Sequence, residues 1–256
     1  MNYQIKKEGK FSYIEEGEGT PVLLLHGLMG SLSNFDSVVE GLRRNGYRAL
    51  IPSLPLYTIS LLKASVKGLS SYVHQFVKHK QLEDFYILGN SLGGHISLVF
   101  TKRHPEHVKG LVLTGSSGLY ENAGSSYPKR GSRDYVEEKT KEVFYNPATA
   151  TPALVDEVYD IVNNRAKILH TLSISKSAIR HNMEKDLPKI AKPTLLIWGR
   201  NDIVTPPEVA VQFNQLLPHS ELQWIEKCGH APMMEHPIIF NRLLIEWLGR
   251  QEGRQP

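Results

Sequence analysis

Short, almost wholly apolar runs alternate along the chain with longer segments whose apolar residues recur every three or four positions. Strands buried on both faces of a sheet produce the first pattern, and helices that cover a sheet produce the second. The sequence therefore predicts an α/β fold with a mostly parallel sheet covered by helices on both faces. The predicted strands are residues 21–25, 47–52, 85–88, 108–114, 194–198 and 221–226, and the predicted helices are residues 34–44, 66–79, 94–104, 207–217 and 237–248. Residues 4–5 and 11–14, broken by Gly9 and Gly17, predict a hairpin that leads into the sheet.

The alternation stops between residues 119 and 185. A loop rich in Gly and Ser precedes helical patterns at residues 134–144, 152–163 and 165–180, and no apolar strand interrupts them. We expect residues 1–118 and 186–256 to form the core and residues 119–185 to form a helical lid. The lid would cover the carboxyl ends of the strands, where open α/β sheets bind ligands. Helices that only decorate the edge of the core are the alternative.

Composition narrows the range of partners. The chain has 256 residues, 41% hydrophobic and 22% charged, which is ordinary for a soluble globular protein. The net charge of +4 comes from basic residues mixed with acidic ones, so nucleic acid is not an expected partner. Cys228 is the single cysteine, the start lacks an apolar signal-peptide core, and no run is long enough for a membrane span. We expect a cytoplasmic protein.

One motif points to nucleophilic chemistry. The sequence Gly89-Asn90-Ser91-Leu92-Gly93-Gly94 follows the apolar run 85–88 and precedes a predicted helix. Gly-x-Ser-x-Gly between a strand and a helix is typical of a nucleophile elbow, in which a sharp turn exposes the serine hydroxyl. A glycine-rich turn that only joins a strand to a helix is the alternative. The rest of the chain has to decide between them.

A serine nucleophile needs a histidine base held by a carboxylate, and in this topology the acid and then the histidine follow later strands. Asp202 comes just after the predicted strand 194–198, and His230 just after the strand 221–226. An Asp at such a turn can also serve only local hydrogen bonds. His95 is the nearest rival to His230, but we expect it to pack or to form a surface hydrogen bond.

Two backbone N–H groups are needed to stabilise an oxyanion. Leu92, directly after Ser91, would supply one, and Leu28, in the loop that starts with His26-Gly27, would supply the other. We expect the His26 side chain to fix this loop by a hydrogen bond.

Taken together, these motifs resemble the α/β-hydrolase fold superfamily, above all its small lidded bacterial serine esterases and carbon–carbon bond hydrolases. The resemblance implies that Ser91 is the nucleophile, Asp202 the acid and His230 the base. The chain departs from the family where an Asp-x-Pro-Gly-x-Gly turn is common, because residues 53–57 read Ser-Leu-Pro-Leu-Tyr. This loop is expected to border the core, so we expect an altered entrance and unchanged chemistry.

The leading hypothesis is a hydrolase that cleaves a small carboxylic ester or lactone through an acyl-enzyme. The alternatives are a carbon–carbon bond hydrolase of vinylogous diketone ring-fission products, and a ligand-binding or signalling protein with little turnover. No cofactor or metal is expected, because Glu235-His236 lacks His-Glu-x-x-His spacing and no Gly-x-Gly-x-x-Gly follows a strand. Aromatic residues of the predicted lid would line a pocket or pack the lid onto the core: Tyr120, Tyr127, Tyr135, Phe144, Tyr145 and Tyr159.

Overall fold

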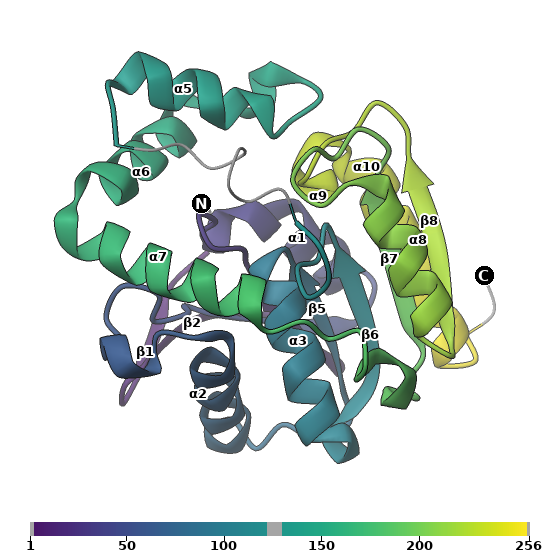
Figure 1. The fold of residues 1–256 in the computed structure, drawn as a ribbon. Helices are drawn as coiled ribbons and strands as arrows, with labels where there is room; N and C mark the ends of the chain where they lie inside the picture. Colours follow the sequence, from purple (N-terminus) through teal and green to yellow (C-terminus); the bar gives the residue numbers. More distant parts are fainter. Residues whose placement is uncertain (1–2, 122–129, 255–256) are drawn as a thin grey trace.

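A single eight-stranded sheet forms the centre of the protein in the computed structural model, which describes residues 3–121 and 130–254 (Figure 1). The strand order is β1-β2-β4-β3-β5-β6-β7-β8. Strands β3 to β8 are parallel, and only β1 and β2 run antiparallel to their neighbours. The predicted α/β architecture is thus confirmed. The strands are β1 (Lys6–Glu8), β2 (Phe11–Glu16), β3 (Thr20–Leu25), β4 (Tyr47–Pro52), β5 (Phe85–Asn90), β6 (Val108–Thr114), β7 (Thr194–Gly199) and β8 (Ser220–Ile225).

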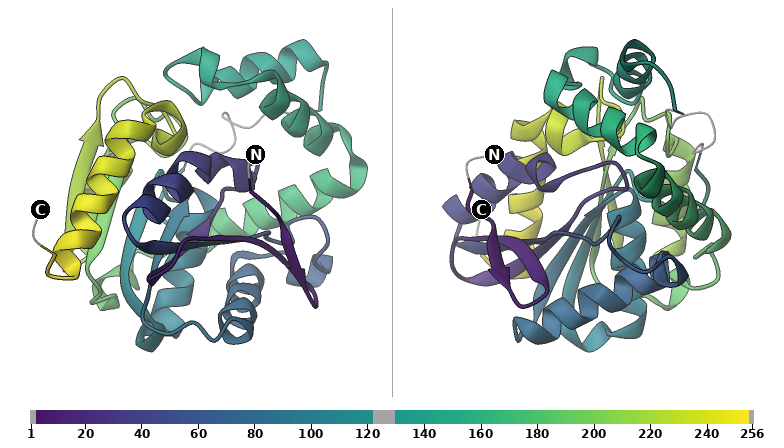
Figure 2. Two further views of the ribbon diagram at one scale, coloured as in Figure 1. Left: turned by 180° about the vertical axis from the view of Figure 1, so that it is seen from behind. Right: turned by 90° about the vertical axis from the view of Figure 1, so that its left-hand side faces the viewer.

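Alternate side chains of strands β2 to β7 enter two separate apolar layers. Leu23 and Leu25 of β3 pack on one face of the sheet, and Val22 and Leu24 pack on the other. The first face is covered by α2 (Val66–His79), α3 (Leu92–Arg103) and α8 (Pro207–Leu216). The second is covered by α1 (Asp36–Arg44) and α10 (Pro237–Gln251) (Figure 2). Burial on both faces is why these strands are continuously apolar in sequence.

The N-terminal hairpin differs from the prediction in its first strand. β1 spans Lys6–Glu8 rather than residues 4–5, and its three side chains are exposed. Lys6 pairs with Tyr13 across a turn in which Gly9 has a φ of +57°. Turn geometry and pairing with β2 therefore set this edge strand, and no hydrophobic pattern marks it in the sequence.

The regular elements of residues 130–185, between β6 and β7, are all helices. They are α5 (Arg133–Glu142), the short 3-10 helix η4 (Pro147–Thr149), α6 (Pro152–Asn163) and α7 (Arg165–Arg180). Ser132, Thr151 and Asn164 cap the starts of α5, α6 and α7 with side-chain oxygens, which fixes where these helices begin. The three helices arch over the end of the sheet at which the parallel strands terminate (Figure 1).

The remaining short elements are the 3-10 helices η1 (Leu32–Phe35), η2 (Leu61–Lys63), η3 (Pro105–His107) and η5 (Leu187–Lys189), and the one-turn helix α9 (Pro232–Glu235). None of the described helices combines the length and apolarity needed to cross a bilayer.

Candidate active site

Ser91 lies on a strained turn between β5 and α3. Its φ of 55° and ψ of −119° are rare for a residue with a side chain and cost on the order of 1 to 3 kcal/mol. The neighbouring glycines make the turn possible, because a Cβ on Gly93 would lie 2.0 Å from the carbonyl oxygen of Leu25. A Cβ on Gly89 would likewise meet the Gly93 backbone at 2.4 Å. The motif therefore forms the sharp strand–turn–helix geometry that the sequence predicts, rather than an ordinary linker.

Asp202 and His230 lie on the loops that follow β7 and β8, and the structure brings them together. Nδ1 of His230 is 2.9 Å from Oδ2 and 3.1 Å from Oδ1 of Asp202. The carboxylate is held by the backbone N–H groups of Val204 and Thr205, at 2.9 and 3.0 Å, and by the Thr205 hydroxyl at 2.8 Å. An ionised carboxylate only accepts hydrogen bonds, so Nδ1 carries the proton and Nε2 of a neutral His230 is an acceptor.

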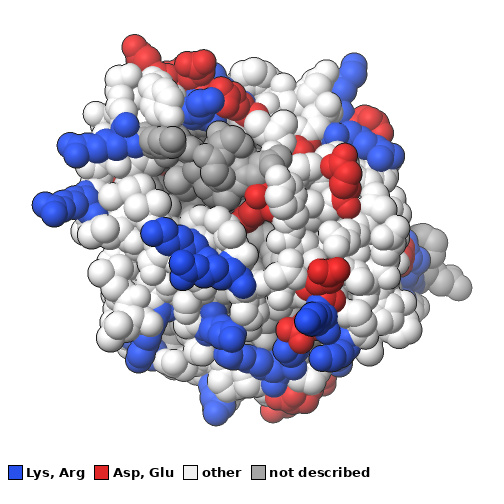
Figure 3. Space-filling model, viewed as in Figure 1, with Lys and Arg blue, Asp and Glu red and all other residues white. Residues whose placement is uncertain are grey.

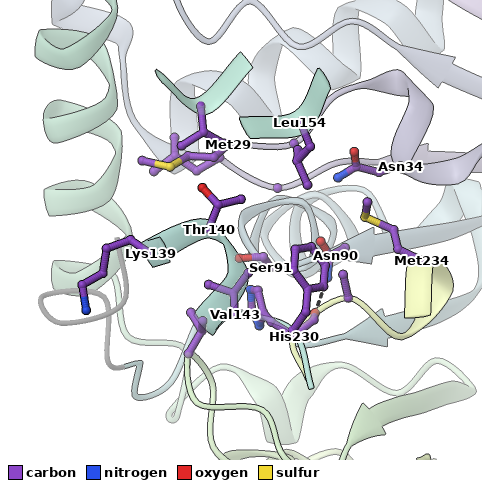
Figure 4. Close-up of a pocket in the computed structure, with 17 residues that line it drawn as sticks. Met29, Asn34, Asn90, Ser91, Lys139, Thr140, Val143, Leu154, His230 and Met234 are labelled. Atoms are coloured by element: carbon purple, nitrogen blue, oxygen red, sulfur yellow. Dashed lines mark hydrogen bonds between the residues drawn. The ribbon is translucent and has the colours of Figure 1, made fainter. Parts of the chain in front are cut away.

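His230 and Ser91 line the same pocket. Nε2 is buried and has no hydrogen-bond partner within the described residues, and Figure 4 shows the Ser91 and His230 side chains side by side. Burial alone would lower the pKa of His230, but the Asp202 carboxylate, assisted by Glu121 and Glu235, outweighs it and raises the pKa. The site thus holds a basic nitrogen next to a serine hydroxyl.

The loop after β3 lies against the Ser91 turn. A Cβ on Gly27 would be 3.2 Å from the Cβ of Ser91, so the chain passes close to the serine here. Leu28 follows in this loop, and Leu92 is the first residue of α3, where an N–H has no acceptor within the helix. Leu28 and Leu92, the predicted oxyanion donors, are thus the residues next in the chain to Gly27 and Ser91, which approach each other here. Nδ1 of His26 is 2.9 Å from the Gly27 carbonyl oxygen, as expected of a residue that fixes the loop.

Three residues that the sequence analysis did not single out hold these loops in place. The Asn90 amide donates to the carbonyl of His230 at 3.2 Å and to that of Thr114 at 3.1 Å. The Tyr57 hydroxyl donates to the Leu28 carbonyl at 3.2 Å, so the loop at residues 53–57 borders the predicted oxyanion loop as well as the core.

Glu235 is the third of these residues, and it joins the His230 loop to the helices above the site. Its carboxylate accepts from the Gly229 N–H at 2.6 Å and from the Asn146 N–H at 3.0 Å. The backbone N–H of His230 also donates to the carbonyl of Val143, just after α5, at 2.9 Å. Two hydrogen bonds to opposite sides of one junction make Glu235 a bridge between core and helical segment.

The pocket is mostly apolar. Its wall is formed by the loop after β3, by the C-terminal end of α5 and by α6, which contribute Leu28, Met29, Val143, Phe144, Leu154 and Val158. Val204, Ala231 and Met234 complete the wall. Lys139 is the one cationic lysine or arginine among the described lining residues. Its ammonium is paired with Glu142 at 2.7 Å and is directed away from Ser91 (Figure 4). Within residues 3–121 and 130–254 no group of three His, Cys, Asp or Glu side chains is arranged to hold a metal ion.

Most of the predicted aromatic lining lies elsewhere. Phe144 lines the pocket, whereas Tyr120, Tyr145 and Tyr159 are exposed. Tyr135 packs against the small cluster between α5 and α6, and Tyr127 lies outside the described residues.

For His95 we expected packing or a surface hydrogen bond, and the structure agrees with packing. It is fully buried, and its Nε2 lies 3.0 Å from Nδ1 of His181, because α3 is enclosed by the core. Burial, with a smaller contribution from His181, lowers the pKa of His95 to about 3.

With this geometry established, the class of protein is clear. A model of the alpha/beta hydrolase fold family matches residues 20–142 and 135–237, and the chain belongs to that family. The resemblance inferred from the motifs is thereby confirmed.

Individual relatives narrow the class to enzymes. The chain is 51% identical to an alpha/beta hydrolase enzyme from the metagenome of sediments from the Mar Chica lagoon, Morocco, with a TM-score of 0.82 and coverage of 97% of this chain and 99% of that one. It is 26% identical to a 2-hydroxy-6-oxononadienedioate/2-hydroxy-6-oxononatrienedioate hydrolase of Pseudomonas sp, over 94% of this chain and 93% of the relative. It is 29% identical to Lipase 1 of Psychrobacter immobilis, over 88% and 76%. The protein is a hydrolase, as predicted.

Proposed function

We propose that this hydrolase cleaves a carboxylic ester or a lactone through an acyl-enzyme formed on Ser91. The observation that carries the proposal is the orientation of His230. Its Nδ1 is bonded to Asp202 at 2.9 Å, which leaves the buried Nε2 without a partner among the described residues, in a side chain that lies beside Ser91 (Figure 4). A serine hydroxyl becomes a competent nucleophile when such an imidazole accepts its proton.

Each step of the reaction has a group in place. His230 Nε2 takes the Ser91 proton as Oγ attacks the ester carbonyl, and Asp202 stabilises the imidazolium. The N–H groups of Leu28 and Leu92 stabilise the negative oxygen of the tetrahedral intermediate. Nε2–H then protonates the leaving alcohol, and water activated by the same nitrogen releases the acid. In a lactone the leaving alcohol stays attached to the acid that is released.

The helical segment at residues 119–185 serves as the lid in this proposal. Val143, Phe144, Leu154 and Val158 make it the outer wall of the pocket. Water is thereby limited around the reacting carbonyl, which strengthens the hydrogen bonds to the oxyanion.

The chemistry of the pocket wall favours a neutral ester over a charged ring-fission product. The Pseudomonas relative is named for a dienedioate, a substrate with two carboxylates. Binding a dianion in an apolar pocket requires cationic partners, and Lys139 is already paired with Glu142. The carbon–carbon bond hydrolase stays the second candidate, because that relative covers nearly the whole chain.

One set of assays tests both candidates. Wild type and Ser91→Ala are compared on aryl esters of graded acyl length, on lactones and on ring-fission dienoates. We expect wild type to turn over the esters or lactones, Ser91→Ala to lose at least about a thousandfold in kcat, and a fluorophosphonate to add to Ser91 alone in mass spectra. Unchanged turnover by Ser91→Ala would contradict the assigned nucleophile. Turnover of dienoates without esters would replace the first candidate by the second.

A further inference from the structure

The outward face of α7 carries apolar side chains where a surface helix normally carries polar ones. Leu169, Leu172 and Ile179 are 50%, 47% and 55% exposed. They recur at helical spacing on one side, while Thr171, Ile174 and Ala178 occupy the buried side. The helix therefore satisfies its contacts with the core and still presents three large aliphatic residues to solvent.

The 3-10 helix η2 extends this face. Leu61 is 50% exposed and Leu62 is 97% exposed. Side chains of α7 fasten it to the chain around η2: Nε2 of His170 lies 2.8 Å from the Ile59 carbonyl oxygen, and the Ser173 hydroxyl donates to the Ala64 carbonyl at 3.1 Å. The two elements therefore form one surface. We call it the α7–η2 surface and define its apolar part as Leu61, Leu62, Leu169, Leu172 and Ile179.

Basic residues frame the apolar part. Residues 165–180 contain four Lys or Arg and no Asp or Glu; Figure 3 shows Lys and Arg side chains over α7. One of the four, Lys167, is paired with Asp160 of α6. The others, together with two lysines in and after η2, form no ion pair with any residue in the described ranges: Lys63, Lys67, Arg165, Lys176 and Arg180.

Exposed aliphatic residues surrounded by unpaired cations are complementary to a partner that is both apolar and anionic. We propose that the α7–η2 surface docks the protein on membranes that contain anionic phospholipids. The leucines and the isoleucine would enter the boundary between headgroups and acyl chains, and the cations would contact the headgroup phosphates. A second copy of the chain is a poorer partner, because a two-fold contact would place the same cations opposite each other.

Vesicle flotation tests this proposal independently of the proposed reaction. Wild type is mixed with vesicles of phosphatidylcholine alone or with vesicles that also contain roughly 30% phosphatidylglycerol, an anionic lipid that gives the vesicle a negative surface potential. We expect at least about tenfold stronger binding to the anionic vesicles, lost at about 0.5 M salt because exposed charges are then screened. Ser91→Ala should bind as wild type does.

Two double variants locate the surface. The double variant Lys176→Glu with Arg180→Glu should bind the anionic vesicles about tenfold or more weakly than wild type. The double variant Leu62→Asn with Leu172→Asn should also lose binding to these vesicles, although its net charge is unchanged. Arg44→Glu with Arg242→Glu, on α1 and α10 across the sheet, is the charge-matched control and should bind like wild type. None of these residues is among those that line the pocket beside Ser91, so unchanged turnover of a soluble ester reports that each variant is folded.

Three results would overturn the proposal. The first is a wild type that does not bind anionic vesicles. The second is an equal loss of vesicle binding in Lys176→Glu with Arg180→Glu and in its control, Arg44→Glu with Arg242→Glu. The third is a dimer of the wild type in sedimentation that the two double variants of the α7–η2 surface dissociate. The last would identify a second copy as the occupant of this surface.

Discussion

Glu235 shows how one carboxylate can link two parts of the site. It joins the His230 loop, through Gly229, to the helical segment, through Asn146. The substitution Glu235→Gln keeps one of these two hydrogen bonds, because the amide oxygen still accepts from one N–H. It loses the other, because the amide NH₂ group is itself a donor and faces the second N–H. We expect kcat to fall about tenfold, equivalent to ~1.4 kcal/mol, because His230 is then held less firmly.

The pH profile separates a positioning role from a loss of folding. Glu235 helps to raise the pKa of His230, and the proposed reaction needs this histidine neutral. Activity of the wild type should therefore fall as the pH drops through that raised pKa, and the acid limb of kcat/KM should move to lower pH in Glu235→Gln. Glu226→Gln, whose side chain is 75% exposed and paired with Arg200, is the matched control. An unmoved acid limb would leave Glu235 a purely structural residue.

Residues of the site divide by whether a local pattern encodes them. Ser91, Asp202 and His230 are predictable because each follows a predicted strand in a recognisable turn. Asn90, Tyr57 and Glu235 act on partners 140, 29 and 89 positions away in the chain. Such contacts come from the fold as a whole, so no motif reveals them.

At the scale of elements, the turn into α3 is a tightly packed junction. A Cβ on Gly93 would meet the carbonyl oxygen of Leu25 at 2.0 Å, and this backbone atom belongs to a central strand. We expect Gly93→Ala to lower the free energy of unfolding by more than about 2 kcal/mol and to reduce ester turnover by displacing Ser91. Urea unfolding monitored by circular dichroism measures the first effect.

Gly249→Ala is the control for the intrinsic effect of alanine in a helix. Gly249 lies in α10, and a Cβ there would meet only Cβ of Arg254, at 3.9 Å. This variant should be more stable by roughly 0.5 to 1 kcal/mol. If Gly93→Ala were equally well tolerated, the close packing inferred for the turn would be wrong.

Long elements are predictable and short ones are not. The predicted bounds of β4, β6, α2, α6 and α7 agree with the structure, because each has enough residues to show its period. η2 and α9 have three and four residues, too few for a helical repeat to appear, and both carry residues on which the proposals rest. η2 belongs to the α7–η2 surface, and α9 carries Glu235 at its end.

At the scale of the whole molecule, a histidine cluster couples stability to pH. The rings of His74 on α2 and His104 after α3 are stacked with centroids 3.8 Å apart. Burial lowers the pKa of both, and each is lowered further by nearby cations, including Lys78 beside His74 and Arg103 beside His104. The Glu106 carboxylate acts in the opposite direction on the pKa of both histidines. Two stacked imidazoles do not both gain a proton without repulsion, so acid acts against this contact.

The direction of the effect follows from linkage. In the unfolded state a histidine has a pKa of about 6.5. A histidine whose pKa is lower than this in the folded state therefore binds protons more readily in the unfolded state. The stability it contributes is present above that value and is lost as the pH falls toward the folded pKa. Burial lowers the pKa of His26 and His95 as well, so both act in the same direction. The free energy of unfolding should therefore be smaller at pH 5 than at pH 7.

The substitution His74→Phe isolates the contribution of the stack. It keeps an aromatic ring against His104 and removes one titrating group, so the slope of unfolding free energy between pH 7 and pH 5 should decrease. The upper limit is one proton, or about 1.4 kcal/mol per pH unit. Tyr72→Phe, on the same helix, removes a hydroxyl that donates to the Ser53 carbonyl and should shift stability equally at both pH values. If His74→Phe left the slope as steep as in wild type, the acid sensitivity would have to come from other groups, among them the remaining histidines whose pKa is lowered by burial: His26, His95, His104 and His181.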